Sequence, residues 1–95
     1  MLNFTINNQH TDVIRTICFN KDERYLLSAS YDKSLVVYDI QNNYSASTKL
    51  ENFHDDKIRM IKFSNDGEYL LSLGHDGKLK CFAFKHFLEK PFEVL

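Results

Sequence analysis

The sequence is poor in the residues that usually mark special chemistry. Its 95 residues include no tryptophan, one proline, three glycines and two cysteines. Cys18 and Cys81 lie far apart without CxxC spacing, and the four histidines do not cluster with them, so neither a disulfide scaffold nor a metal site is predicted. We expect both cysteines to be reduced and buried. No glycine-rich phosphate loop is present, and we expect no cofactor.

Strong net charge and long apolar runs are also missing. The net charge is −1, which argues against a surface that binds nucleic acid or anionic lipid. No apolar run is long enough to cross a bilayer, and the first residues lack the basic and apolar regions of a secretory signal. With 43% hydrophobic and 26% charged residues, the composition is typical of a folded domain. We therefore expect an intracellular protein, cytoplasmic or nuclear, with no membrane partner.

The main positive feature is an internal repeat. Residues 10–39 align with residues 54–83 at a constant offset of 44, without insertion or deletion, and 13 of the 30 paired positions are identical. A gapless repeat of this period is typical of stacked supersecondary units, none of which can bury its apolar face alone.

Each repeat has the pattern of three short strands. Polar turns separate them, and Asp76-Gly77 is a strong hairpin signal because that turn needs positive φ angles. The nearly continuous apolar runs predict strands that are covered on both faces. The predicted strands are residues 14–19, 25–29 and 35–38 in the first repeat, and residues 58–63, 69–73 and 79–82 in the second.

A fourth strand is predicted at residues 44–50, between the repeats. Equivalent outer strands are expected at residues 2–6 and 92–95. The alternative for the C-terminus is a short helix, since Phe84, Phe87 and Leu88 have helical spacing before Pro91. Four strands in each repeat of this length are typical of a propeller blade.

The motifs within the repeats resemble those of the WD40 repeat family, over about 75 of the 95 residues. In order these are an opening His, a Leu-Leu-Ser strand, an Asp in the hairpin turn, and an aromatic residue at the end of the third strand. Neither copy has the family's Gly before His or its Trp. The motif residues are His10, Leu26-Leu27-Ser28-Ala29-Ser30, Asp32 and Tyr38-Asp39, then His54, Leu70-Leu71-Ser72-Leu73-Gly74, Asp76 and Phe82-Ala83.

The resemblance implies an all-β fold with two four-stranded antiparallel WD40-type blades. The expected units are residues 1–9 as an outer strand and lead-in, 10–53 as the first blade and 54–95 as the second. Because propellers have ~4–8 blades, we expect this chain to be part of a larger propeller. The remaining blades would come from the same or another chain.

The resemblance also implies a hydrogen-bonded tetrad within each blade. Phe82 has no hydroxyl, so the second network is expected to be incomplete. The implied tetrads are His10, Ser28, Asp32 and Tyr38, and then His54, Ser72, Asp76 and Phe82.

Serine, histidine and aspartate also compose a hydrolase triad. Here the same trio occurs in both repeats, and no GxSxG nucleophile elbow accompanies either copy. We therefore predict that the chain is not an enzyme and has no catalytic residues.

Function is expected on the exposed rim of the blades. In WD40 propellers the binding face is lined by residues next to the first strand and before the turn Asp. These positions are Val13, Arg15, Tyr31, Lys57, Arg59 and His75. The predicted function is a non-catalytic scaffold for other proteins or peptides.

One alternative is a reader of acidic or phosphorylated peptides through Arg15, Lys57 and Arg59, because Arg makes bidentate contacts with such groups. Against it, Arg15 and Arg59 could form solvated surface pairs of little energetic value. A further alternative is a scaffold associated with nucleic acid.

Overall fold

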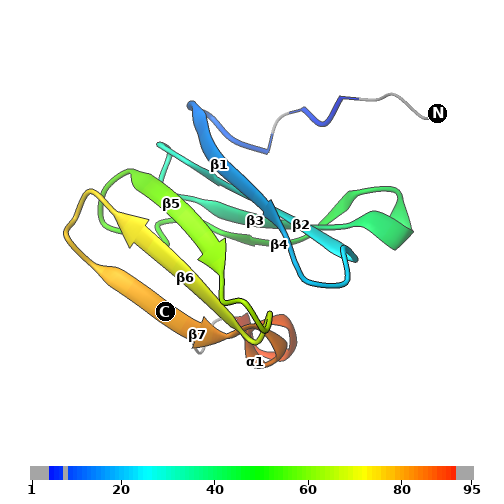
Figure 1. Cartoon of the computed structure of the whole chain (residues 1–95). Helices are drawn as coiled ribbons and strands as arrows, with labels where there is room; N and C mark the ends of the chain where they lie inside the picture. Colours follow the sequence, from blue (N-terminus) through cyan, green and yellow to red (C-terminus); the bar gives the residue numbers. More distant parts are fainter. Residues whose placement is uncertain (1–4, 8, 92–95) are drawn as a thin grey trace.

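In the part of the chain that the structure describes, the fold consists of two antiparallel sheets and one short α-helix (Figure 1). The computed structural model describes residues 5–7 and 9–91. The first sheet has the order β1-β2-β3-β4, and its strands are β1 (Ile14–Phe19), β2 (Tyr25–Ser30), β3 (Leu35–Asp39) and β4 (Ser45–Leu50). The second has the order β5-β6-β7, and its strands are β5 (Ile58–Phe63), β6 (Tyr69–Gly74) and β7 (Leu79–Ala83).

The predicted all-β class is confirmed, and so are the three strands predicted within each repeat. The fourth strand expected at residues 44–50 is β4. A single 3-10 turn, Ile40–Asn42, precedes it, and Asp39 caps that turn by accepting a hydrogen bond from the Gln41 backbone N–H. The division of the chain at residues 9/10 and 53/54 stays a prediction.

The outer strands expected at the two ends of the chain lie largely outside the described residues. Residues 92–95 and 2–4 lie outside the described residues, and neither Thr5 nor Ile6 belongs to a strand. After β7 the chain forms helix α1 (Phe84–Glu89), the alternative predicted from the spacing of the apolar residues. Phe84 and Phe87 are buried and hold the helix against the second sheet.

Each sheet contains a bulge at the same place in the repeat. The register shifts between Ile14 and Thr16 in the first sheet and between Ile58 and Met60 in the second. A bulge adds one residue to the strand, which allows residues three apart to face the same side. Ile58 and Ile61 consequently both join the core.

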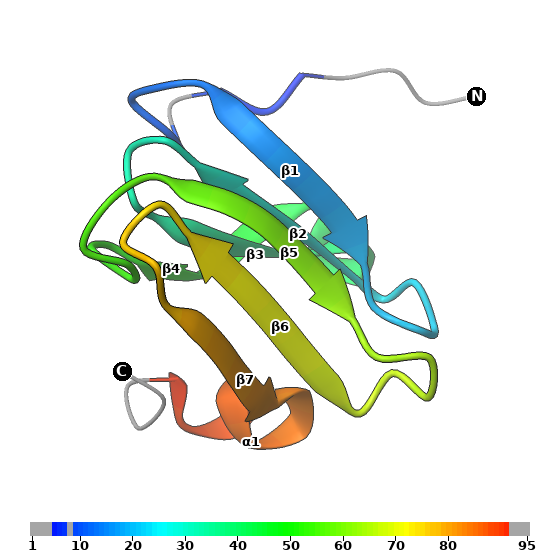
Figure 2. The same cartoon turned by 60° about the vertical axis from the view of Figure 1, so that its left-hand side comes forward.

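The sheets stack face to face, with β5 against β1 and β2 (Figure 2). The core between them is apolar. It comprises Leu27, Ala29, Leu35, Val37 and Leu50 from the first sheet, Ile58, Ile61, Leu70 and Phe82 from the second, and Phe53, Phe84 and Phe87 from the segments that follow the sheets.

The expectation that all strands are covered on both faces is wrong for the second sheet, where Met60 on β5 and Leu79 on β7 are 49% and 65% exposed, and also for β1. Ile14 is 52% exposed and Ile17 is 61% exposed, because the second sheet covers only one face of the first. The expectation that both cysteines are buried is wrong for Cys81, which lies exposed on β7. Cys18 is half-buried, and burial raises the pKa of its thiol to about 12.

The hairpin turn between the second and third strands needs a left-handed residue in both repeats. Gly77 supplies it in the second sheet with φ +79°, whereas Lys33 adopts φ +75° in the first. A residue with a Cβ pays a conformational penalty in this region that glycine does not.

Replacing Lys33 with glycine should therefore raise the free energy of unfolding by about 0.5–1 kcal/mol. Urea denaturation would measure the change, with Lys33→Ala as the matched control that keeps the Cβ. Equal stability of the glycine and alanine variants would contradict this account of the turn.

Candidate functional site

An aspartate in the hairpin turn ties together two segments of the first repeat. The Asp32 carboxylate accepts hydrogen bonds from the backbone N–H of Thr11, at 2.9 Å, and of Ser34, also at 2.9 Å. It also accepts one from the Ser34 hydroxyl, at 2.5 Å. Since Thr11 precedes β1 and Ser34 precedes β3, the carboxylate fixes the entry loop against the β2–β3 turn. We call Asp32, His10, Ser28 and Ser34 the first clasp.

The imidazole of His10 continues this network into the sheet. Its Nε2 lies 2.6 Å from Ser28 Oγ, and Ser28 Oγ lies 3.0 Å from Tyr38 Oη. Its Nδ1 lies 2.8 Å from Ser34 Oγ and 3.3 Å from Asp32 Oδ2. One arrangement of protons satisfies every group when the ring is neutral: Tyr38 donates to Ser28, Ser28 to Nε2, and Nδ1–H to Ser34.

The second clasp consists of Asp76, His54 and Ser72. The Asp76 carboxylate accepts from the backbone N–H groups of Asp55 and Lys78, each at 2.9 Å. His54 Nδ1 lies 3.1 Å from Asp76 Oδ2, and Nε2 lies 2.8 Å from Ser72 Oγ. The same two segments of the repeat are thus joined in the same way.

The two repeats differ at two positions that affect the contact between the imidazole and the carboxylate. Ser34 corresponds to Lys78, whose Nζ lies 2.7 Å from Asp55 instead. Ser30 corresponds to Gly74, where an added Cβ would lie 2.5 Å from His54 Nδ1. Sequence reasoning missed Ser34, and its only signal was a serine two positions after the turn aspartate.

Phe82 takes the place of the tyrosine that closes the first network. Its ring packs against Phe53, with centroids 5.7 Å apart, and against Phe87, with centroids 5.0 Å apart. The second network is therefore one member shorter. Within residues 5–7 and 9–91, no buried side-chain nitrogen or oxygen lacks a hydrogen-bond partner.

Both aspartates are held in their charged form. Burial favours the neutral form of Asp32, but the hydrogen bonds from Ser34 and Thr11 and the nearby His10 outweigh burial and hold its pKa well below the usual range. At Asp76 burial acts in the same direction. The backbone N–H groups of Lys78 and Asp55, together with His54, outweigh it and lower the pKa to about 2.

The serines of both clasps are closed off from solvent. Ser28 is 3% exposed and Ser72 is 1% exposed, and each hydroxyl is already committed to the imidazole beside it. A hydrolase needs its nucleophile within reach of a substrate carbonyl. The arrangement is therefore typical of a structural network. In the described part of the chain, no group of three or more His, Cys, Asp or Glu side chains could hold a metal ion.

The residues predicted for the binding rim flank the clasps. Backbone hydrogen bonds join Tyr31 N to Val13 O, at 3.0 Å, and His75 N to Lys57 O, at 2.8 Å. The two repeats meet here, because the rings of Tyr31 and His75 have centroids 6.0 Å apart and Lys57 Nζ lies 5.1 Å from the Tyr31 centroid.

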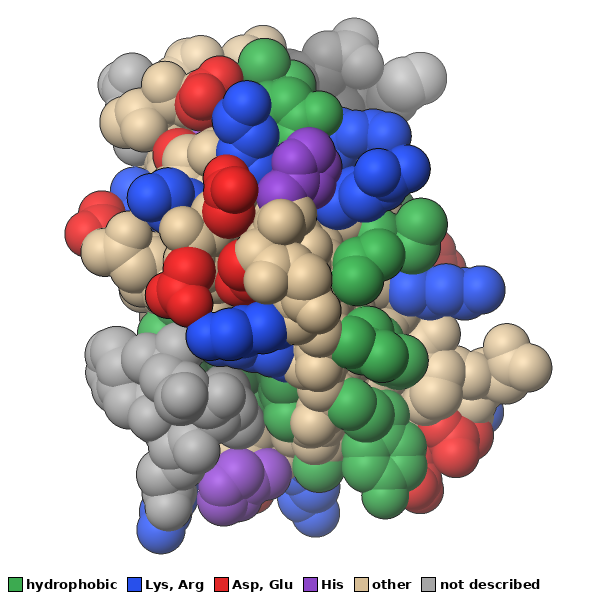
Figure 3. All heavy atoms as spheres, turned by 90° about the vertical axis from the view of Figure 1, so that its left-hand side faces the viewer, with side chains coloured by type: hydrophobic (Ala, Val, Ile, Leu, Met, Phe, Trp, Pro, Cys, Tyr) green, Lys and Arg blue, Asp and Glu red, His purple; other side chains and the backbone are tan. Residues whose placement is uncertain are grey.

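The remaining rim residues extend this surface. Arg15 and Arg59 are exposed, and Arg59 and His75 line an open hollow of about 590 Å³. Lys, Arg and His side chains gather in the upper part of the face in Figure 3. The structure thus brings Tyr31, Lys57 and His75 into contact and places the arginines on the exposed surface around them.

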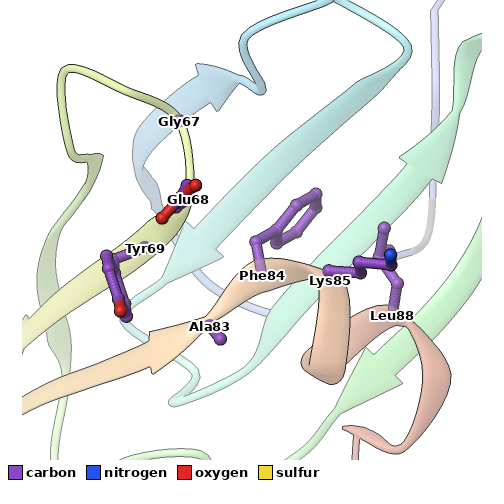
Figure 4. Close-up of a pocket in the computed structure, with 7 residues that line it drawn as sticks. All are labelled: Gly67, Glu68, Tyr69, Ala83, Phe84, Lys85 and Leu88. Carbon is purple, nitrogen blue, oxygen red and sulfur yellow. The ribbon is translucent and has the colours of Figure 1, made fainter.

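A second hollow lies beside helix α1, where β6 begins and β7 ends (Figure 4). Its volume is about 370 Å³, and the Phe84 backbone N–H donates to Glu68 O beside it, at 2.9 Å. The hollow is lined by Gly67, Glu68, Tyr69, Ala83, Phe84, Lys85 and Leu88.

Comparison with known proteins agrees with the repeat found in the sequence. The family described as "WD domain, G-beta repeat" matches residues 3–39 and 47–82. The chain is 38% identical over 48 residues to a Caenorhabditis elegans protein named "probable cytosolic iron-sulfur protein assembly protein CIAO1 homolog". That match covers 50% of this chain and only 14% of the relative. Among the described residues, no helix is long and apolar enough to cross a membrane.

The hydrogen bonds of the first clasp predict that two substitutions lower the stability of the protein by different amounts. Ser28→Ala should cost about 1–3 kcal/mol of unfolding free energy, because it leaves His10 Nε2 and Tyr38 Oη without their shared partner. Tyr38→Phe should cost less, about 1 kcal/mol, because Ser28 keeps its bond to His10. Thermal and urea unfolding would measure both values, and a larger loss for Tyr38→Phe would contradict the proposed chain of donors.

The lowered aspartate pKa values predict acid sensitivity. A carboxyl group whose pKa is lower in the folded than in the unfolded state stabilises the folded protein at pH values above the unfolded-state pKa. This contribution to the free energy of unfolding is lost as the pH falls toward the folded-state pKa. The free energy of unfolding should therefore fall from about pH 4 to about pH 2. In Asp32→Asn the slope over this interval should be shallower, whatever the absolute stability. An unchanged slope would contradict the account.

Proposed function

Because this chain belongs to the WD40 family, we propose that it is a non-catalytic scaffold on which other proteins assemble. Members of this family generally act by binding proteins. The observation that carries the proposal is the rim where the half-buried Tyr31 of one repeat meets the exposed Lys57 and His75 of the next. Aromatic and cationic side chains held at fixed positions are typical anchors of a protein interface.

The rim is held in place by the clasps. Residues 11–13 and 55–57 lie between the clasp histidines and the first strand of each sheet, and the clasp aspartates bind Thr11 and Asp55 directly. A preorganised surface loses little conformational entropy when a partner binds. The burial of the clasp serines argues against their use as hydrolytic nucleophiles.

The relative suggests the setting of this function. Its name describes a cytosolic assembly protein, and this chain matches only 14% of its length. We propose that this chain likewise supports assembly of other proteins inside the cell, as part of a propeller completed by further blades. The partners of the relative are not carried over.

A test of the scaffold compares proteins captured by the wild-type chain with those captured by the triple variant Tyr31→Ala, Lys57→Ala, His75→Ala. Quantitative mass spectrometry should show a defined set lost from the variant. A control with Lys21→Ala and Lys85→Ala, two exposed residues that do not line the rim hollow, should retain that set. Identical captured proteins for all three chains would contradict a binding role for the rim.

A second candidate is a reader of acidic or phosphorylated peptides. The observation that favours it is that Arg15, Lys57 and Arg59 are exposed and form no ion pair with any residue in the described part of the chain. Unpaired arginines can make bidentate bonds to a carboxylate or phosphate without first breaking an existing pair.

This candidate has its own test with a defined probe. Fluorescence anisotropy would follow an acidic peptide and its phosphoserine form, with wild type and with Arg15→Glu/Arg59→Glu. The double variant should bind at least about tenfold more weakly, since each charged hydrogen bond contributes about 1.5–3 kcal/mol. The control Lys21→Glu/Lys85→Glu has the same net charge and should bind like wild type. Equal affinity for both double variants would exclude the reader and leave the scaffold.

A further inference from the structure

The hairpin turn between β2 and β3 contains a lysine in a strained backbone conformation. Lys33 adopts φ +75°, in the left-handed region that disfavours a residue with a Cβ. The equivalent residue of the second repeat is Gly77, which adopts φ +79°. The two turns therefore share one backbone conformation, and only the first carries a side chain at this position.

Backbone hydrogen bonds fix Lys33 in this conformation from both sides. Its N–H donates to Ser30 O, at 3.2 Å, and its carbonyl oxygen accepts from the Phe53 N–H, at 2.9 Å. Phe53 is 0% exposed and directly precedes His54 of the second clasp. A glycine would form both hydrogen bonds through the same backbone atoms, so neither bond explains why the position holds a lysine.

Contacts of the side chain do not explain the lysine either. A Cβ added at Gly77 would meet nothing within 4 Å, so packing does not decide between glycine and a larger residue in the second turn. In the described part of the chain, Lys33 forms no ion pair and no side-chain hydrogen bond. Lys78, by contrast, pairs with Asp55 at 2.7 Å. Strained residues whose side chains have no internal role are concentrated at ligand-binding sites.

The turn that holds Lys33 belongs to the candidate binding rim. The rim residue Tyr31 and the clasp residue Asp32 directly precede Lys33. The Asp32 carboxylate accepts a hydrogen bond from the Ser34 N–H, so both neighbours of Lys33 in the turn are held in place. Glu23, whose counterpart in the second repeat is also a glycine, lies in the β1–β2 turn at the opposite end of the sheet.

We propose that Lys33 is a further binding residue of the rim and that its ammonium group pairs with an anionic side chain of a bound peptide. This inference rests on the proposed reading of acidic peptides by the rim and adds a residue to it. A glycine suits the backbone of this turn better but presents no charge to the peptide. Because Arg15, Lys57 and Arg59 would face the same partner, the peptide should carry more than one anionic group.

Three substitutions separate the charge of Lys33 from the strain of its backbone. Lys33→Met keeps the Cβ and a long side chain but removes the charge, Lys33→Arg keeps the Cβ and the charge, and Lys33→Gly removes both. Fluorescence anisotropy would measure the affinity of each variant for the acidic peptide and for its phosphoserine form. Urea denaturation would measure stability, and Lys85→Met on the exposed side of α1 is the matched control.

Lys33→Met should bind both peptides at least about threefold more weakly than wild type at unchanged stability, because an exposed charge pair is lost. Lys33→Gly should bind as weakly and be more stable than wild type, whereas Lys33→Arg and Lys85→Met should bind like wild type. Wild-type affinity in Lys33→Met would overturn this inference. The reader function would stand in that case if Arg15→Glu/Arg59→Glu still weakened binding. A wild-type chain that binds neither peptide would overturn both.

Discussion

The clasp aspartate is the constraint on which the arrangement of each repeat depends. One carboxylate accepts hydrogen bonds from the backbone N–H of the entry loop and from the backbone N–H of the turn before the third strand. It also pairs with the histidine that opens the repeat. It thereby fixes where the first strand begins relative to the hairpin beside it. The rim residues on either side of Asp32 and Asp76 are placed as a consequence, so the candidate binding surface depends on a largely buried charge.

The two repeats satisfy the same aspartate in different ways, and the difference arises from a few positions. Ser34 stands between the imidazole and the carboxylate in the first repeat, whereas Lys78 turns outward to Asp55 in the second. Gly74 then allows His54 to approach the carboxylate directly. The second sheet lacks the tyrosine hydroxyl and instead builds an aromatic cluster around Phe82. Equivalent positions in a degenerate repeat can thus exchange polar contacts for packing without changing the strand order.

Strand positions were predictable from the sequence because they depend on local patterns that occur twice. Alignment of the two repeats placed their turns at equivalent positions. The apolar runs predicted strands at residues 14–19 and 58–63, and the structure has strands there. Exposure was not predictable, because an apolar strand does not reveal which of its faces has a neighbouring sheet. Ile17 and Ile61 lie at equivalent positions of the two repeats and have opposite exposure. Ser34 escaped prediction because the second repeat has lysine at that position, so comparison of the copies concealed it.

The central claim is that both histidines are held by the aspartate clasps in one defined tautomer. Imidazole nitrogen-15 shifts, recorded by NMR on the neutral rings, test it most directly. The account predicts that His10 and His54 each carry the proton on Nδ1, with an unprotonated Nε2 accepting a hydrogen bond from serine. Asp32→Asn and Asp76→Asn should disturb only the histidine of their own repeat. Shifts of a rapidly averaged, solvated imidazole at either residue would contradict the claim.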